Sequence, residues 1–186
     1  VLKNYTYFGI QNDRTKSGDN YLVQYNALNV RQSGSPVSLL TLQLQQDLRL
    51  GILNWQNVLT LQKSSKDDIL PVPLFNAYSN LFIRFRIARV LDVDLGVDGR
   101  YFTDYYAPEY IPGIGAFGIQ ETEASRTKIG NYPVLDAYAN FQLQHTRFFV
   151  MFSHVNSSDG GDYFFTPHYP LNQRIFRFGI SWNFFN

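Results

Sequence analysis

Large apolar residues recur at every second position along most of the chain, which is the periodicity of a β-strand with one apolar face. In 38–50, for example, leucines share one face, whereas polar residues such as Gln43 and Gln45 share the other. Helical periodicity is convincing nowhere. The segments with an extended pattern are 4–10, 38–50, 53–62, 80–88, 92–102, 134–144, 147–155 and 174–186. We therefore predict an all-β protein, with the least regular alternation in 4–10 and 53–62.

The connections between these segments alternate in length. The breaks near 50–52, 88–92 and 144–147 are tight. The long connections, which we interpret as external loops, are 11–37, 64–74, 104–132 and 156–173. Tight turns on one side and long loops on the other, joining strands of about 9–11 residues, are typical of an outer-membrane β-barrel. The pattern therefore predicts an antiparallel transmembrane β-barrel over 1–186.

Segment 20–30 also has the alternation of a strand. Counting it as a span would place a long connection, 11–20, on the side of the tight turns. We therefore interpret 20–30 as β-structure within the first external loop. This leaves about eight spans in the chain.

The closing segment predicts a strand that faces lipid. Its alternate positions are Phe176, Phe178, Ile180, Trp182 and Phe184. In water, so aromatic a face on a terminal strand would invite aggregation. In a bilayer, lipid covers these side chains, and Trp182 and Phe184 fall near the interface where aromatic girdles occur. The alternative that stays open is a dimer-interface strand of a soluble protein.

Composition favours the membrane interpretation. Aromatic residues make up 17% of the chain and charged residues also 17%, against about 25% charged residues in average soluble domains. Leu, Phe, Tyr and Trp at this density would pack poorly as a soluble core. The net charge of +1 provides no field that would attract nucleic acid. The absence of cysteine excludes disulfides, thiolate metal sites and cysteine nucleophiles.

The polar faces of the predicted strands carry charges that would line the barrel interior. An unpaired charge buried without water costs at least several kcal/mol, roughly, so we expect these side chains to be solvated or paired. Registers that keep the inward faces together set Arg86 opposite Asp94, or Arg84 opposite Asp98. The predicted lumen-lining residues are Arg84, Arg86, Asp94, Asp98, Arg100 and Asp136. Arginines set against carboxylates would produce a transverse field across the lumen.

Two motifs suggest ligand chemistry, and neither has the context it needs. The stretch "GIGAFG" (113–118) matches a dinucleotide-binding pattern but lacks the preceding strand and following helix of that site, so we interpret it as a loop. Asp92, Asp94 and Asp98 offer hard oxygen ligands. They spread over about 20 Å of one strand, which is too far for one ion. We expect these aspartates to line the lumen and form salt bridges instead.

The remaining candidate residues predict neither catalysis nor a cofactor. The three histidines, His145, His154 and His168, lie in different segments without metal-ligand spacing. We expect His145 in a turn, His154 facing the lumen and His168 in a loop. No Ser-His-acid set can be singled out. The loop "NSSDGGD" (156–162) has a composition that calcium-binding and flexible loops share. We therefore predict a protein that is not an enzyme, with no metal and no cofactor.

Several longer stretches resemble a known family. The stretches "NYPVLDAYANFQLQHTRFFVMFSHVN", "YFFTPHYPLNQRIFRFGISWNFF" and "DVDLGVDGRYFTDYYAPEYIP" resemble the C-terminal part of the putative porins of Bacteroidetes outer membranes. The stretch "TLQKSSKDDILPVPLFNAYSNL" is similar to the preceding hairpin of that family. The resemblance implies an outer-membrane β-barrel whose C-terminal strand is read by the barrel-assembly machinery. Members are usually longer, so the chain would supply only the last eight or so strands.

Three functional hypotheses follow. The first is a porin that lets small hydrophilic solutes diffuse passively through a charged lumen. The second is a non-conducting accessory or structural barrel within a larger outer-membrane complex. The third, a barrel enzyme, would need a convergent Ser/His/acid set. Expected partners are outer-membrane lipid, the assembly machinery, and either further copies of the chain or other outer-membrane proteins. Because eight strands leave an interior just filled by side chains, a wet pore would require additional strands.

Overall fold

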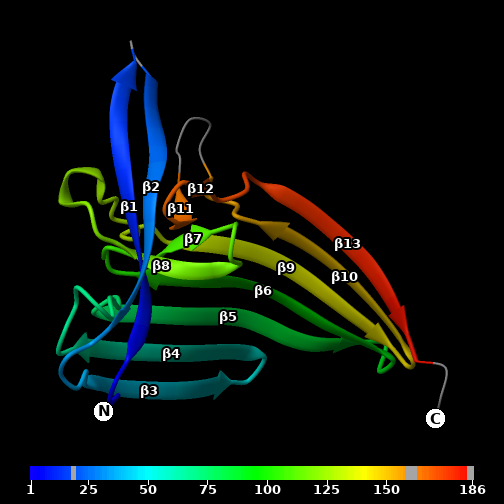
Figure 1. The fold of residues 1–186 in the computed structure, drawn as a ribbon. Coiled ribbons are helices and arrows are strands. Elements are labelled where there is room, and N and C mark those ends of the chain that lie inside the picture. Colours follow the sequence, from blue (N-terminus) through cyan, green and yellow to red (C-terminus); the bar gives the residue numbers. More distant parts are fainter. Residues whose placement is uncertain (18–19, 158–162, 184–186) are drawn as a thin grey trace.

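The computed structural model describes residues 1–17, 20–157 and 163–183. Its main element is a seven-stranded sheet in the order β13-β10-β9-β6-β5-β4-β3, in which every neighbouring pair is antiparallel. Each strand pairs with its neighbours along the chain, which makes a meander (Figure 1). The strands are β3 (Leu39–Leu50), β4 (Leu53–Ser64), β5 (Phe75–Ile87), β6 (Leu91–Phe102), β9 (Val134–Leu143), β10 (Thr146–Ser153) and β13 (Ile175–Trp182). The predicted all-β class is confirmed.

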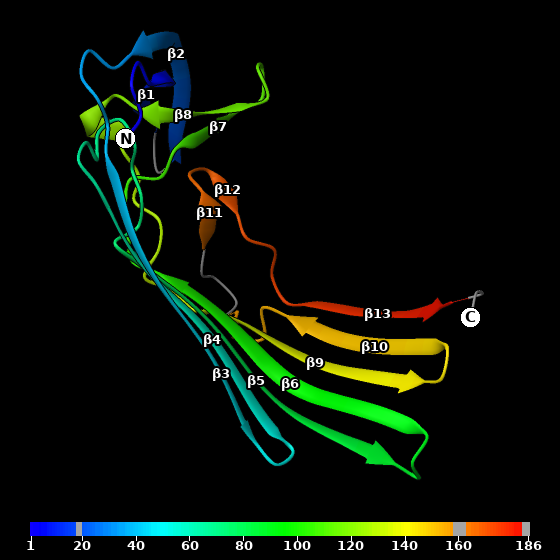
Figure 2. The same cartoon turned by 90° about the horizontal axis from the view of Figure 1, so that it is seen from below.

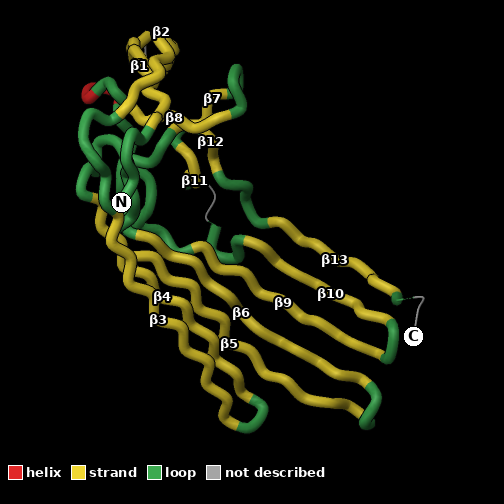
Figure 3. Tube along the Cα trace, turned by 60° about the horizontal axis from the view of Figure 1, so that its bottom comes forward, coloured by secondary structure: helices red, strands yellow, loops and turns green. Residues whose placement is uncertain are grey.

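The connections of this sheet alternate as predicted. Tight turns join β3 to β4, β5 to β6 and β9 to β10, and residues such as Gly51, Ala88 and Gln144 adopt positive φ angles there. The connections at the other ends of these strands are long. Together with the N-terminal segment before β3, they carry all the remaining elements (Figure 3). The sheet therefore has a turn end and a loop end, and we use these names below.

The sheet is curved and open. Figure 2 shows it bending so that β3 and β13 form its two separated edges. Neither edge pairs with another strand in the described part of the chain. No closed barrel is therefore found, and the predicted barrel is represented by a curved antiparallel wall.

Seven of the predicted spans belong to this wall, and segment 4–10 does not. It begins β1 (Thr6–Ser17), which pairs with β2 (Asn20–Gln32) in a long hairpin outside the main sheet. The alternation of polar and apolar residues defines the faces of a strand but not its neighbour, and here β2 satisfies the backbone groups of β1. The β-structure predicted for 20–30 is present as β2.

The long connections build a second assembly at the loop end. β7 (Glu109–Ile111) and β8 (Ala116–Gln120) form a hairpin, and β8 pairs in parallel with β1 to give the order β2-β1-β8-β7. The other elements are the single-turn η1 (Glu123–Ser125), β11 (Phe164–Thr166) and β12 (Tyr169–Pro170). The "GIGAFG" stretch, predicted as a loop, is only half loop: 113–115 form the β7–β8 turn, and 116–118 begin β8.

Buried apolar side chains are concentrated in the loop assembly and not in the wall. Ile10, Val37, Ala107, Ile111 and Ile129 are buried there. The wall contributes only Phe82 and Val93 to the buried apolar set of the described residues. Most large apolar side chains of the wall remain exposed, so this sheet has no core of its own beneath it.

Candidate functional site

The polar positions of the wall share its concave face. Cross-strand pairs such as Asn54 with Phe82, Asp94 with Asn140 and Gln142 with Arg147 connect one face from β4 to β10. A hollow of about 620 Å³ on this face is lined by residues from β4, β5, β6, β9, β10 and β13. The face that curves around this hollow is therefore the polar one.

All six predicted lumen-lining residues lie on this face, but their pairing differs from the prediction. Arg84 stands opposite Asp94, and Arg86 stands opposite Asp92. The expected pairs, Arg86 with Asp94 or Arg84 with Asp98, are wrong. The β5–β6 turn occupies only three residues, because Ala88 and Arg89 adopt left-handed conformations, and the strands pair from Ile87 and Leu91 onward.

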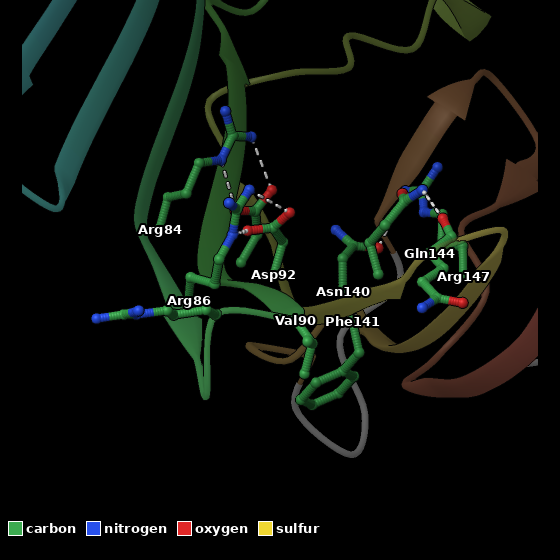
Figure 4. A pocket seen from close by; sticks show the side chains of 11 residues that line it. Arg84, Arg86, Val90, Asp92, Asn140, Phe141, Gln144 and Arg147 are labelled. Carbon is green, nitrogen blue, oxygen red and sulfur yellow. Dashed lines mark hydrogen bonds and ion pairs between the residues drawn. The ribbon is translucent and has the colours of Figure 1, made fainter.

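Both arginine–aspartate pairs are bidentate. Arg84 donates from Nε and Nη2 to the two carboxylate oxygens of Asp94 at 2.7 and 2.8 Å. Arg86 makes the same arrangement with Asp92 at 2.5 and 2.9 Å (Figure 4). Each charge is thus neutralised by a neighbour in the same wall. The transverse field expected across a closed lumen stays a prediction, because the described residues form one open wall.

The other predicted lining residues lie nearer the loop end. Asp98 pairs directly with Asp136 across β6 and β9. The backbone N–H of His154 donates to Asp136 Oδ1 at 2.7 Å, and the guanidinium of Arg100 lies 5.8 Å from the ring centre of Tyr78. The wall therefore carries Asp98 and Asp136 toward its loop end and the Arg84 and Arg86 pairs toward its turn end.

A side-chain brace that the sequence analysis missed crosses the middle of this face. Gly96 on β6 leaves space for the ring of Tyr138 on β9, whose hydroxyl donates to Asn80 Oδ1 on β5 at 2.8 Å. A Cβ at Gly96 would lie only 2.7 Å from the Tyr138 ring. A lone glycine inside a strand often marks such a close approach, and this was the available signal.

The convex face carries the exposed apolar side chains. Phe176, Phe178, Ile180 and Trp182 all lie on it, and Phe178 and Trp182 are 74% and 62% exposed. The fifth residue predicted there, Phe184, lies outside the described residues. Among the other exposed side chains of this face are Leu40, Leu42, Leu44, Trp55, Leu81 and Val97.

Three polar side chains on the convex face are hydrogen-bonded to one another. Trp55 Nε1 donates to Ser79 Oγ at 2.9 Å, and Ser79 Oγ donates to Asn57 Oδ1 at 2.7 Å. Asn57 is 7% exposed. This hydrogen-bonded chain is what a polar group next to lipid requires, since hydrocarbon offers it no partner.

The loop end contains a buried, hydrogen-bonded histidine and an ion pair. His154, expected to face the lumen, is instead buried, with Tyr132 Oη 2.8 Å from its Nε2 and the Asn172 carbonyl 2.8 Å from its Nδ1. His145 lies in the β9–β10 turn and His168 between β11 and β12, as predicted for a turn and a loop.

The ion pair ties the β6–β9 connection to itself. Lys128 Nζ donates to Asp104 Oδ2 at 3.0 Å, and Asn131 Nδ2 donates to Asp104 Oδ1 at 2.9 Å. The hydrogen bond from Lys128 lowers the pKa of the Asp104 carboxyl. The same bond raises the pKa of the Lys128 amine.

The described residues contain neither a metal-ligand cluster nor a membrane-spanning helix. Residues 1–17, 20–157 and 163–183 contain no group of three or more His, Asp or Glu side chains that could hold a metal ion. Residues 158–162 of the candidate calcium loop lie outside these ranges. Within the same ranges, no helix has the length and apolar character needed to cross a bilayer.

Comparison with known proteins places the whole chain in one family. A family model described as "Putative porin" matches residues 1–186. Comparison with curated proteins and with solved structures found no match.

Proposed function

The chain belongs to this porin family, and on that premise we propose that it forms part of the wall of an outer-membrane pore through which small hydrophilic solutes diffuse passively. The concave face would line the water-filled interior, and the convex face would contact lipid. The tight turns would lie on the periplasmic side and the loop assembly on the external side, as is usual for such barrels.

The observation that carries this proposal is the division of the wall into two chemically opposite faces. Exposed leucine and aromatic side chains cover one face, and paired charges and amides cover the other. A soluble sheet would bury its apolar face under another layer, whereas the described part of the chain supplies no such layer. Lipid is the medium that covers such a face without further protein.

Conduction requires more strands than this wall contains. The β3 and β13 edges are unpaired in the described part of the chain, and open edges do not occur in the hydrocarbon region of a bilayer. About eight strands enclose an interior that side chains just fill. We therefore include in the proposal that further strands complete the barrel and widen it, with β3 and β13 as the joining edges.

The loop assembly would narrow the entrance. The β7–β8 hairpin and the β11–β12 hairpin arise from two of the long connections that leave the loop end of the wall, β6–β9 and β10–β13, and Figure 2 shows both beside that end. Folded loops at one mouth would limit the size of solutes that reach the polar face.

The test is conductance of the native, detergent-extracted protein in a planar bilayer, with its intact mass measured on the same preparation. The expected result is stepwise ohmic openings and a mass larger than that of this chain alone, or a fixed oligomer. The matched control is the same protein after thermal unfolding, which should give no steps. A silent membrane containing a folded, heat-modifiable protein would overturn the pore and favour a non-conducting accessory barrel.

A further inference from the structure

We propose that the turn end of the concave face collects small organic anions that carry a carboxylate or phosphate group; this names the solute class of the proposed pore and rests on that function. The site is the hollow of about 910 Å³ at the turn end. Binding sites for small molecules in proteins commonly enclose about 300–1,000 Å³, so the hollow has room for such a solute.

The charges that line this hollow do not balance. Four arginines line it, and only two carboxylates do. The arginines are Arg84, Arg86, Arg89 and Arg147, and the carboxylates are Asp92 and Asp94. The hollow therefore carries two positive charges in excess, although the whole chain has a net charge of only +1.

Two adjacent turns bring these side chains together. Arg84 and Arg86 come from the end of β5, and Arg89 lies in the β5–β6 turn. Arg147 is the second residue of β10, close to the β9–β10 turn. Because β6 pairs with β9 from Leu91 and Leu143 onward, the two turns lie side by side at the turn end of the wall. Figure 4 shows Arg147 and Asn140 beside the same hollow as Arg84 and Arg86.

The existing contacts leave guanidinium donors available. Arg84 and Arg86 each use Nε and Nη2 for aspartate, which leaves Nη1 of each group for another acceptor. Arg147 donates from Nη2 to a neutral amide oxygen of Asn140 at 3.0 Å. Arg89 makes no hydrogen bond or ion pair with residues 1–17, 20–157 or 163–183. The excess charge therefore resides on Arg89 and Arg147.

The chemistry of the donors defines the ligand. A guanidinium presents two parallel N–H groups that match the oxygens of a carboxylate or phosphate. A cation entering the hollow would find both carboxylates already held by arginine. The side chains of Arg84 and Arg86 are 56% and 60% exposed, so water competes for them and binding is weak. Weak binding suits conduction, because a permeating ion must also leave.

The excess charge is local to the turn end. Asp98 lies four residues beyond Asp94 on β6, which is about 13 Å along the strand. There it pairs with a second acid, Asp136. An anion would therefore be attracted to the turn end first and would meet acidic side chains only deeper along the wall.

The test is the reversal potential across a planar bilayer in a gradient of potassium phosphate at about 0.15 M. The variant R89Q/R147Q removes the two unbalanced charges. Two unit charges that act on a permeating ion at about 8 Å in water, screened over about one Debye length, favour an anion and disfavour a cation by the same amount. Together these two effects change the ratio of anion to cation permeability about fourfold. We expect the ratio of anion to cation permeability to fall about fourfold in R89Q/R147Q. The ratio should be unchanged in K3Q/K63Q, which removes equal charge from exposed positions outside the hollow. Open channels with the wild-type ratio in R89Q/R147Q would overturn the site.

A binding measurement separates this inference from the pore itself. The ³¹P line of inorganic phosphate should broaden in the presence of the folded wild-type protein and of K3Q/K63Q, and much less with R89Q/R147Q. If the protein is silent in bilayers but this difference persists, the pore fails and the anion site stands. If phosphate broadens equally with all three proteins, or with none, the anion site is wrong.

Discussion

The Tyr138 brace makes Gly96→Ala a sharp test of the wall. A Cβ at Gly96 would lie 2.6 Å from Phe82 Cβ and 2.7 Å from both Cζ and Oη of Tyr138. Phe82 is buried, so its Cβ, which is fixed close to the backbone of β5, has little room to move. The Tyr138 ring must then swing away, and its hydroxyl loses Asn80.

The expected cost follows from these two effects. Overpacking of this kind costs about 1–3 kcal/mol, and the lost hydrogen bond adds about 0.5–1.5 kcal/mol. The total loss of unfolding free energy is therefore about 2–4 kcal/mol. With a urea dependence of about 2 kcal/mol per molar, the unfolding midpoint should fall by about 1–2 M.

The assay is urea unfolding of the protein in lipid vesicles, followed by the fluorescence of Trp55 and Trp182. The matched control is Gly113→Ala, because Gly113 has nothing within 4 Å of an added Cβ and no positive φ angle. That control should be neutral or slightly stabilising, since alanine restricts the unfolded chain. Tyr138→Phe keeps the ring and should cost only the hydrogen bond, about 1 kcal/mol.

Coupling between the two sites decides whether the brace exists. If Gly96→Ala already displaces Tyr138, the further loss from Tyr138→Phe in that background should nearly vanish. Full additivity of the two substitutions would refute the brace. A Gly96→Ala protein as stable as Gly113→Ala would refute it independently.

Two further predictions test the wall charges and the loop end. Arg84→Asp or Asp94→Arg alone should lower the unfolding free energy, measured by urea unfolding, by about 1 kcal/mol, as expected for a half-exposed pair. The double variant, which exchanges the two charges, should recover part of that loss. A double variant less stable than both single variants would contradict the pairing. The lowered pKa of Asp104 means that its contact with Lys128 stabilises the loop fully above the ordinary aspartate pKa, and that this stabilisation is lost as pH falls through the lowered value. The raised pKa of Lys128 means that the contact stabilises the loop fully below the ordinary lysine pKa, and that this is lost as pH rises through the raised value. The side-chain amide of Asn131, which donates to Asp104, should therefore titrate in NMR with a midpoint below that of an ordinary aspartate and should not titrate in Asp104→Asn; a midpoint at or above the ordinary value would contradict this.

Alternation along the chain was sufficient to find the strands of the wall, because each strand separates its two faces strongly. Segment 38–50 corresponds to β3 within one residue. The start of β5 was missed by five residues, because the convex positions Ala77 and Ser79 are small and interrupt the apolar pattern. Sequence alternation therefore locates strands best where both faces have pronounced character.

Register and partner choice could not be predicted in the same way. In the β5–β6 turn, Ala88 and Arg89 adopt left-handed backbone conformations, which neither residue type favours. The expected arginine–aspartate pairs were therefore displaced. Likewise, the contact of Tyr138 with Gly96 and Asn80 joins three strands, and no local pattern encodes it. The excess of arginine at the turn end depends on two turns becoming neighbours, which only the sheet order reveals.

The parallel pairing of β1 with β8 has a consequence for the order of folding. All pairs in the wall join strands adjacent in the meander, so each pairing closes a loop no longer than the connection between those two strands. In contrast, Gly9 pairs with Ile119, and this contact must close a loop that contains β3 to β6. Its entropy cost is smallest once those strands have already brought the two ends together. The N-terminal hairpin is therefore expected to dock only after β3 to β6 have assembled, whether or not β9, β10 and β13 have already joined the wall.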